Sequence, residues 1–132
     1  MKNKSKLEKI KNQKKKMVNV PAEWLYLSPS EVSVRDLSDS FENPEQIEIW
    51  EDARVAEVIL GEKASMDMEW YECDLGDEES NAFLEKHQIR TMYVVTIPPQ
   101  EFEAARICMQ KITARNGGFF CGDTDDFTPM VK

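Results

Sequence analysis

The feature that most constrains the fold is an alternation of strand and helix patterns between residues 65 and 122. Residues 65–73 alternate apolar and polar side chains, as a strand with one solvated face does. Residues 90–97 form a nearly continuous apolar run, typical of a strand covered on both faces, and residues 119–122 form a third, shorter run. Two segments with helical patterns separate these runs. The order predicts two successive β-α-β units with right-handed crossovers.

Both connecting helices carry end signals. The first follows Asp77, which can cap it, and the acids in its first turn suit the positive end of the helix dipole. The second is expected from about Pro99 to Arg115, before a stop at Asn116-Gly117-Gly118. Its apolar residues recur at helical spacing and predict a buried stripe. The stripe comprises Phe102, Ala105, Cys108, Met109 and Ile112.

The N-terminal half of the chain gives weaker signals. The run 24–27 is apolar and is expected to pack as a strand or a wrapping segment. Ser30 is expected to cap a brief helix that ends near Leu37. Residues 45–60 are ambiguous, because Asn43 and Pro44 suit a helix start while the later β-branched run favours strands. We favour strands near 46–50 and 54–60.

Together these patterns predict an α+β fold. We expect a mixed sheet of about four to five strands with two main helices packed on it, as in a ferredoxin-like layer. Both helices should cover the same face unless the strand order reverses. A chain of 132 residues with 41 % hydrophobic residues can bury the core of one domain. The predicted organisation is a basic, flexible arm over residues 1–17 and a single acidic α+β domain over residues 18–132.

Charge is distributed very unevenly along the chain. Eight of the 17 Lys and Arg residues lie in the first sixteen positions, and 24 of the 25 acidic residues lie after them. From residue 17 onward the net charge is therefore −15. Such a body attracts cationic partners and repels nucleic acid. For the arm we expect a frayed helix or disorder, with a nucleic-acid contact or docking onto the protein's own acidic face as alternatives.

The cysteines and the apolar runs indicate in which cellular compartment the protein is expected. Cys73, Cys108 and Cys121 form no CxxC pair and are odd in number, so we expect free thiols and a cytoplasmic protein. The lysines at the start resemble the first part of a signal peptide, but no uninterrupted apolar run follows them. No run has the length of a membrane span. We therefore predict neither secretion nor a membrane partner.

Two acidic clusters are the candidate sites. One follows the strand near 66–73 and the other follows the strand near 119–122. If those strands run in the same direction, both clusters lie at one edge of the sheet, where open α/β sheets usually bind ligands. Each cluster can also serve only as helix and turn caps. The candidate partner-binding residues are Asp74, Asp77, Glu78, Asp123, Asp125 and Asp126.

No motif is specific enough to identify a function, so charge and size carry the prediction. We expect a non-enzymatic binding protein, an acidic inhibitor or immunity-type protein or an adaptor, that engages a basic protein. One alternative is a small metal-assisted hydrolase or phosphotransfer enzyme that uses Asp74 with Asp123 or Asp125. A second is a ligand-sensing regulatory domain. We predict no cofactor, no catalytic residue and no metal site, and the oligomeric state stays open.

Overall fold

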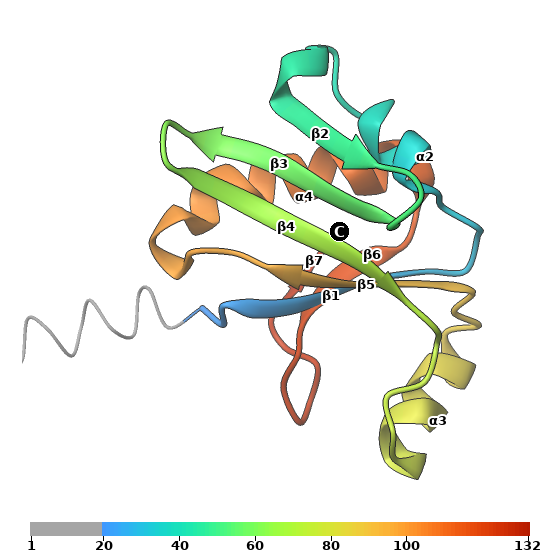
Figure 1. Ribbon diagram of the computed structural model, residues 1–132. Helices are drawn as coiled ribbons and strands as arrows, with labels where there is room; N and C mark the ends of the chain where they lie inside the picture. The colour runs from blue at the N-terminus through green and yellow to red at the C-terminus, as the bar shows by residue number, and fades with distance from the viewer. Residues whose placement is uncertain (1–19) are drawn as a thin grey trace, which may run out of the picture.

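The computed structural model describes residues 20–132, so the predicted basic arm of residues 1–17 lies outside the described residues. Figure 1 shows the arrangement of the elements. In chain order they are β1 (Glu23–Ser28), α2 (Val34–Ser38), the 3-10 turn η1 (Pro44–Gln46), β2 (Ile47–Trp50), β3 (Val55–Gly61), β4 (Ala64–Tyr71), α3 (Glu78–Lys86), β5 (Thr91–Thr96), the 3-10 turn η2 (Pro99–Glu101), α4 (Phe102–Asn116), β6 (Phe119–Gly122) and β7 (Met130–Val131).

The described residues form an α+β fold built on one seven-stranded sheet. The strand order is β2-β3-β4-β5-β1-β6-β7, and every neighbouring pair is antiparallel. The prediction of a mixed sheet of four to five strands is therefore wrong. The early apolar run, residues 24–27, was expected to pack as a strand or a wrapping segment, with no position assigned in the sheet. It forms β1, which lies between β5 and β6 and is buried on both sides.

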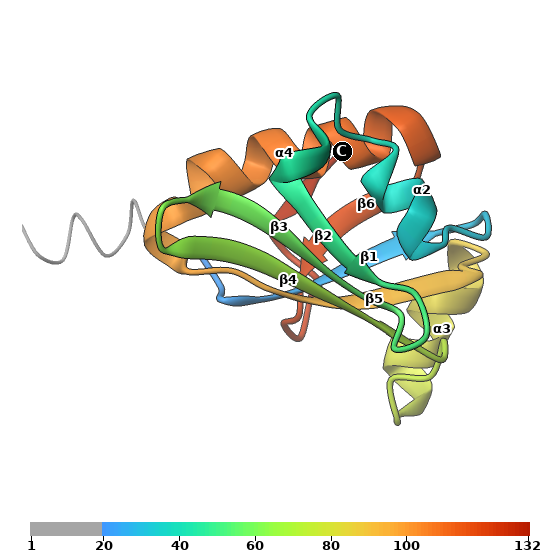
Figure 2. The same ribbon diagram turned by 45° about the horizontal axis from the view of Figure 1, so that its top comes forward.

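The predicted β-α-β units and ferredoxin-like layer are also wrong. β4 and β5 are antiparallel neighbours, so α3 belongs to the connection of a hairpin and not to a parallel crossover. β5 and β6 do run in the same direction, but β1 lies between them. The two main helices lie on opposite faces of the sheet, with α4 on one side and α3 on the other (Figure 2). Side-chain alternation along a strand gives no information about which way its neighbour runs.

The sheet face beneath α4, which we call the covered face, carries the main core. The predicted stripe of α4 is confirmed at Ala105, Cys108, Met109 and Ile112, which are buried, whereas Phe102 is half-buried. The Phe102 ring stacks on Trp24 with 5.6 Å between ring centroids. Close packing of this kind supplies most of the stability of a small domain. Other core residues of the covered face and its helices are Tyr26, Leu37, Ala56, Val58, Met66, Met68, Tyr93, Val95 and Phe120.

The opposite side, which we call the outer face, has a smaller core at one end. The α3 residue Leu84 packs there together with Phe127 of the loop between β6 and β7, and the ring of Phe83 stacks on Phe127 at 4.0 Å. This layer covers parts of β1, β5 and β6, and it leaves the outer face of β2, β3 and much of β4 exposed. The buried residues of this second core are Leu25, Leu27, Leu84, Met92, Phe119, Cys121 and Phe127.

Local predictions fared better than topology. Strands near 46–50 and 54–60 are confirmed as β2 and β3, and Asp77 caps α3 as expected. The brief early helix starts later than predicted, because its cap is Ser33 and not Ser30. Ser33 and Asp36 form a capping box in which each side chain accepts the other's backbone N–H. The last strand, β7, has only two residues, and their sequence gives no pattern that predicts a strand.

All three cysteines are free, as predicted. Cys73 is exposed, whereas Cys108 and Cys121 are buried, one in each core. Burial raises the pKa of the Cys121 thiol to about 12, and the nearby Asp123 carboxylate adds to the effect. No helix within residues 20–132 has the length and apolar character needed to cross a membrane.

Candidate functional site

The structure brings part of the predicted acidic site together. A cleft of about 620 Å³ lies on the outer face between the start of α3 and the β6–β7 loop. Asp77, Asp123 and Asp125 line it, together with Glu79. The remaining lining residues are Leu75, Ser80, Thr124 and Phe127. We call this hollow the acidic cleft.

The other predicted residues lie elsewhere. Asp74 lines a separate hollow beside Cys73 and Asn81. Glu78 and Asp126 are exposed but line neither hollow. The predicted reason for the convergence is also incorrect, because β4 and β6 run in opposite directions and do not end at one edge. The two clusters meet because α3 packs over the outer face beside the β6–β7 loop.

Asp77 and Asp74 have structural partners. The Asp77 carboxylate accepts a hydrogen bond from the backbone N–H of Ser80 at 2.8 Å, which caps α3 and lowers the pKa of Asp77. The Asp74 carboxylate accepts from the Asn81 side chain at 3.0 Å and from the Gly76 backbone at 2.8 Å. These bonds favour the charged carboxylate and lower the pKa of Asp74. Both residues therefore organise the start of α3.

Asp126 closes the loop between β6 and β7. Its carboxylate accepts hydrogen bonds from the hydroxyls of Thr128, at 2.6 Å, and Thr124, at 3.0 Å, and these bonds lower its pKa. For the neighbouring Asp123 and Asp125, no hydrogen bond from another side chain is among those that the described residues form. Their carboxylates are exposed at the acidic cleft and are available to a partner.

The metal-assisted alternative lacks an assembled ligand set. Asp74 is not part of the cleft that holds Asp123 and Asp125. Across residues 20–132, no three His, Cys, Asp or Glu side chains are grouped so that they could hold a metal ion. The acidic cleft is therefore a charged surface and not a preformed cation cage.

A second acidic feature crosses the outer face of the sheet. In the strand register Glu48 of β2 lies opposite Glu57 of β3, which lies opposite Asp67 of β4. Asp67 lies opposite Thr96 of β5, and Thr96 opposite Glu23 of β1. Residues directly opposite each other share one face of a sheet. Glu48, Glu57, Asp67 and Glu23 thus form a line across five strands, which we call the acidic row.

The acidic row has no cationic partner among the described residues. The ion pairs of residues 20–132 are Arg35–Glu51, Arg90–Glu31, Arg106–Glu103 and Arg115–Asp39, and none includes a residue of the row. Like charges directly opposite each other in a sheet are destabilising. Glu57 has such a neighbour on each side. The row therefore stores repulsion that a bound cation relieves.

Apolar side chains lie directly beside the acidic row. In the next line of the register Trp50 lies opposite Val55, followed by Glu69 and then Val94. These residues help to line a hollow of about 490 Å³ that also includes Glu57 and Asp67. Trp50 is 45 % exposed, and Tyr71 at the far end of β4 is 47 % exposed. Exposed aromatic rings beside unpaired charges are typical of binding surfaces.

The acidic row ends beside the acidic cleft. The backbone N–H of Asp123 donates to the carbonyl of Glu23 at 3.0 Å, so the loop acids begin where the row ends. Sequence reasoning missed the row, although it did assign Asp67 and Glu69 to a solvated face. The available signal was Asp67 and Glu69 at alternate positions of β4, and single acids between apolar neighbours at Glu48 of β2 and Glu57 of β3. Only strand pairing reveals that they align.

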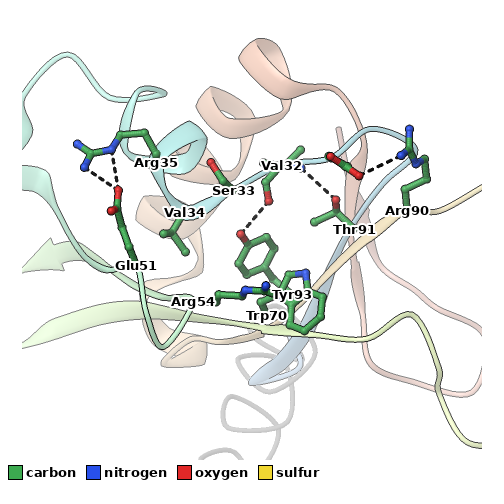
Figure 3. A pocket seen from close by; sticks show the side chains of 11 residues that line it. Val32, Ser33, Val34, Arg35, Glu51, Arg54, Trp70, Arg90, Thr91 and Tyr93 are labelled. Carbon is green, nitrogen blue, oxygen red and sulfur yellow. Dashed lines mark hydrogen bonds and ion pairs between the residues drawn. The ribbon is translucent and has the colours of Figure 1, made fainter.

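A third hollow, of about 470 Å³, lies between α2 and the adjoining end of the sheet (Figure 3). The guanidinium of Arg54 lies 4.2 Å from the centre of the Trp70 ring, a cation–π contact. Arg54 is in no ion pair with the described residues, whereas Arg35 and Arg90 at the rim each pair with a glutamate. We call this hollow the arginine pocket. Three of the nine Lys and Arg residues after position 19 line it.

Hydrogen bonds hold the floor of the arginine pocket together. The hydroxyl of Tyr93 donates to the carbonyl of Val32 at 2.8 Å, and the hydroxyl of Thr91 accepts from the Val32 backbone N–H at 3.0 Å. Burial raises the pKa of the Tyr93 hydroxyl, so the group stays protonated and keeps donating. These bonds tie the segment before α2 to β5 (Figure 3).

Comparison of the chain with known protein families, with curated proteins and with solved structures gives no match. The function proposed below therefore rests on the residues of this chain alone.

Proposed function

We propose that this is a non-enzymatic binding protein, an acidic inhibitor or immunity-type protein or an adaptor, that engages a basic protein through its outer face. One observation supports this most directly: four carboxylates align across five strands with no cation paired to them among the described residues. Asp77, Asp123 and Asp125 extend the same surface into the acidic cleft. Three free thiols support a reducing compartment such as the cytoplasm.

The surface suits lysine and arginine side chains in particular. Their aliphatic stems can lie on apolar surface while their charged heads reach solvent or a carboxylate. Trp50, Val55 and Val94 supply the apolar floor, and the acidic row runs alongside. Complementary charge accelerates the encounter and rejects acidic partners, while buried aromatic anchors supply most of the affinity. Trp50 and Tyr71 are the anchors that we assign to this role.

The test compares three forms of the full-length protein. The first is unchanged, the second carries Glu48→Gln, Glu57→Gln and Asp67→Asn, and the third carries Glu42→Gln, Glu45→Gln and Glu85→Gln as a control with the same charge change. Each is used as bait in native lysate, with salt elution and mass spectrometry. The captured protein is then purified, and its association rate is measured against ionic strength.

The expected result is a basic protein that binds the unchanged and control forms alike. With the acidic-row variant, association should slow at least tenfold at low salt and depend less on salt, because fewer charges steer the encounter. Equal rates for all three forms would exclude the outer face as the binding surface. A captured protein of acidic or neutral character would contradict the proposal as a whole.

The arginine pocket favours a second candidate, a ligand-sensing domain. Its supporting observation is the Arg54 guanidinium, which is stacked on Trp70 and forms no ion pair with a described carboxylate. A volume of about 470 Å³ falls in the range of small-molecule sites. A small carboxylate such as citrate is the probe, followed by amide NMR shifts of Trp70 and Thr91. Arg54→Gln should abolish the shifts and Lys63→Gln should not; an absence of shifts in the unchanged protein removes this candidate.

A further inference from the structure

The acidic row ends where the N-terminal residues join the sheet. Glu23 is both the first residue of β1 and the last member of the row. The residues just before it are held in place: the Ile97 N–H donates to the Ala22 carbonyl at 2.9 Å, and the Trp24 indole N–H donates to the Pro21 carbonyl at 2.6 Å. The described part of the chain therefore begins beside the row.

The charges of the arm and of the row are complementary. The first sixteen residues hold eight lysines and one acid, whereas the nine Lys and Arg residues after position 19 form no ion pair with the row. The outer face between β2 and β4 is exposed and has the apolar hollow beside the row. Nothing among the described residues neutralises it. The chain thus contains the cation that its own exposed face lacks.

We propose that the basic arm of residues 1–17 binds the acidic row of its own chain. The distance permits this: the row crosses four inter-strand spacings, about 19 Å. Fifteen residues span about 50 Å when extended, and about 22 Å as a helix. An arm of this length can therefore extend along the whole acidic row. Because the arm is tethered at Val20, its effective concentration at the row is of millimolar order.

Arm binding has a consequence for recognition. A basic partner that approaches the outer face must displace the arm, so isolated cations and weakly basic proteins are excluded. The arm contributes exposed charge pairs and few apolar contacts, and such pairs are weak and sensitive to salt. It is therefore a competitor that a strongly complementary surface can remove. The arm contact itself needs no outside partner, so its failure would leave the proposed function standing.

Zero-length crosslinking of the full-length protein tests the contact directly. A water-soluble carbodiimide activates a carboxylate, a lysine amine attacks it, and an amide bond forms as the activating group leaves as a urea. The crosslinked sites are mapped by mass spectrometry at low salt and in 1 M NaCl. A mixture of isotopically light and heavy protein separates bonds within one chain from bonds between two chains.

We expect amide bonds from the lysines of residues 2–16 to Glu48, Glu57, Asp67 and Glu23 within one chain, reduced at least fivefold by 1 M NaCl. Bonds to the control acids Glu42, Glu45 and Glu85 should be rare. Bonds spread evenly over all exposed acids overturn the proposal. Bonds found only between light and heavy copies overturn it too and assign the row to a second copy of the chain.

An NMR measurement serves as an independent check. Amide signals of Glu57, Asp67 and Thr96 should shift when all eight lysines of residues 2–16 are changed to Gln in the full-length chain. The acidic-row variant should remove this sensitivity to the arm, whereas the Glu42, Glu45 and Glu85 control should keep it. Unchanged signals in the lysine variant would show that the arm does not touch the row.

Discussion

The two faces of the sheet are built from the same strands and have opposite character. On β4, Met66 and Met68 point into the main core and are fully buried, while Asp67 and Glu69 between and beside them are exposed on the outer face. β3 behaves in the same way, with Ala56 and Val58 inside and Glu57 facing out. Alternation along a strand thus lets one segment stabilise the fold with one set of side chains and present charge with the other.

The outer face is itself divided. At one end of β1, β5 and β6 its side chains are apolar, and the nine-residue α3 with the β6–β7 loop covers them. Over β2, β3 and β4 it is acidic and exposed. A helix packs where it can bury apolar area, and a charged face offers little. This difference in character explains why α3 and the β6–β7 loop cover only part of the outer face.

Substitutions on the covered face and on the outer face should differ most in their effect on the stability of the fold. Met66→Ala removes a fully buried side chain from the covered face and should cost about 2–5 kcal/mol in the free energy of unfolding. Met130→Ala makes the same change at a residue that is 44 % exposed on β7, and should cost less than about 1 kcal/mol. Urea unfolding measures both. Equal costs would mean that the two faces are not energetically distinct.

The labelling rates of the two buried thiols report how readily each core opens. Cys108 lies in the main core and Cys121 in the smaller one, while Cys73 is exposed. In native buffer at pH 8, a thiol reagent should label Cys73 first. The two buried thiols react only after local opening, which removes the burial that raises their pKa. Cys121 should therefore be labelled at least about tenfold faster than Cys108, because the smaller layer opens at lower cost. Mass spectrometry follows the order. Labelling of Cys108 before Cys121 would reverse our ranking of the two cores.

Neutralising the centre of the acidic row should stabilise the protein slightly. In the variant whose eight lysines of residues 2–16 are changed to Gln, Glu57→Gln removes repulsion with Glu48 and Asp67, which lie directly opposite, and should raise the free energy of unfolding by about 0.2–1 kcal/mol at low salt. The gain should shrink in 0.5 M NaCl because salt screens the charges. Glu42→Gln serves as the control. A loss of stability in Glu57→Gln would show that the row is internally compensated.

The smallest difference concerns how the cap of α3 depends on pH. Folding lowers the pKa of Asp77, so its contribution is present above the ordinary carboxyl pKa of about 3.9 and is lost as the pH falls below that value. Asp77→Ala should therefore lower the melting temperature more at pH 7 than at pH 3. Asp77→Asn retains a cap and should restore most of the loss at pH 7. A penalty that does not depend on pH would contradict a role for the charged carboxylate.

Much of the fold's local structure was predictable, whereas much of the candidate site was not. The α4 stripe, the Asp77 cap and the strands near 46–50 and 54–60 follow from spacing and capping, which act between residues close in sequence. The acidic cleft was anticipated through Asp77, Asp123 and Asp125, but for a reason that the strand directions exclude. The acidic row was missed because it joins residues of four strands.

From the amino-acid sequence alone we could infer the α+β class, the helices α3 and α4, most of the strands, the free thiols and the excess of negative charge from residue 17 onward. Each of these depends on composition or on contacts within a few residues. Three features follow only from how distant segments pack: β1 lies between β5 and β6, the two main helices cover opposite faces, and Glu48, Glu57, Asp67 and Glu23 align. Strand pairing and direction are set by packing between distant segments, and the pattern within a single strand does not encode its neighbour.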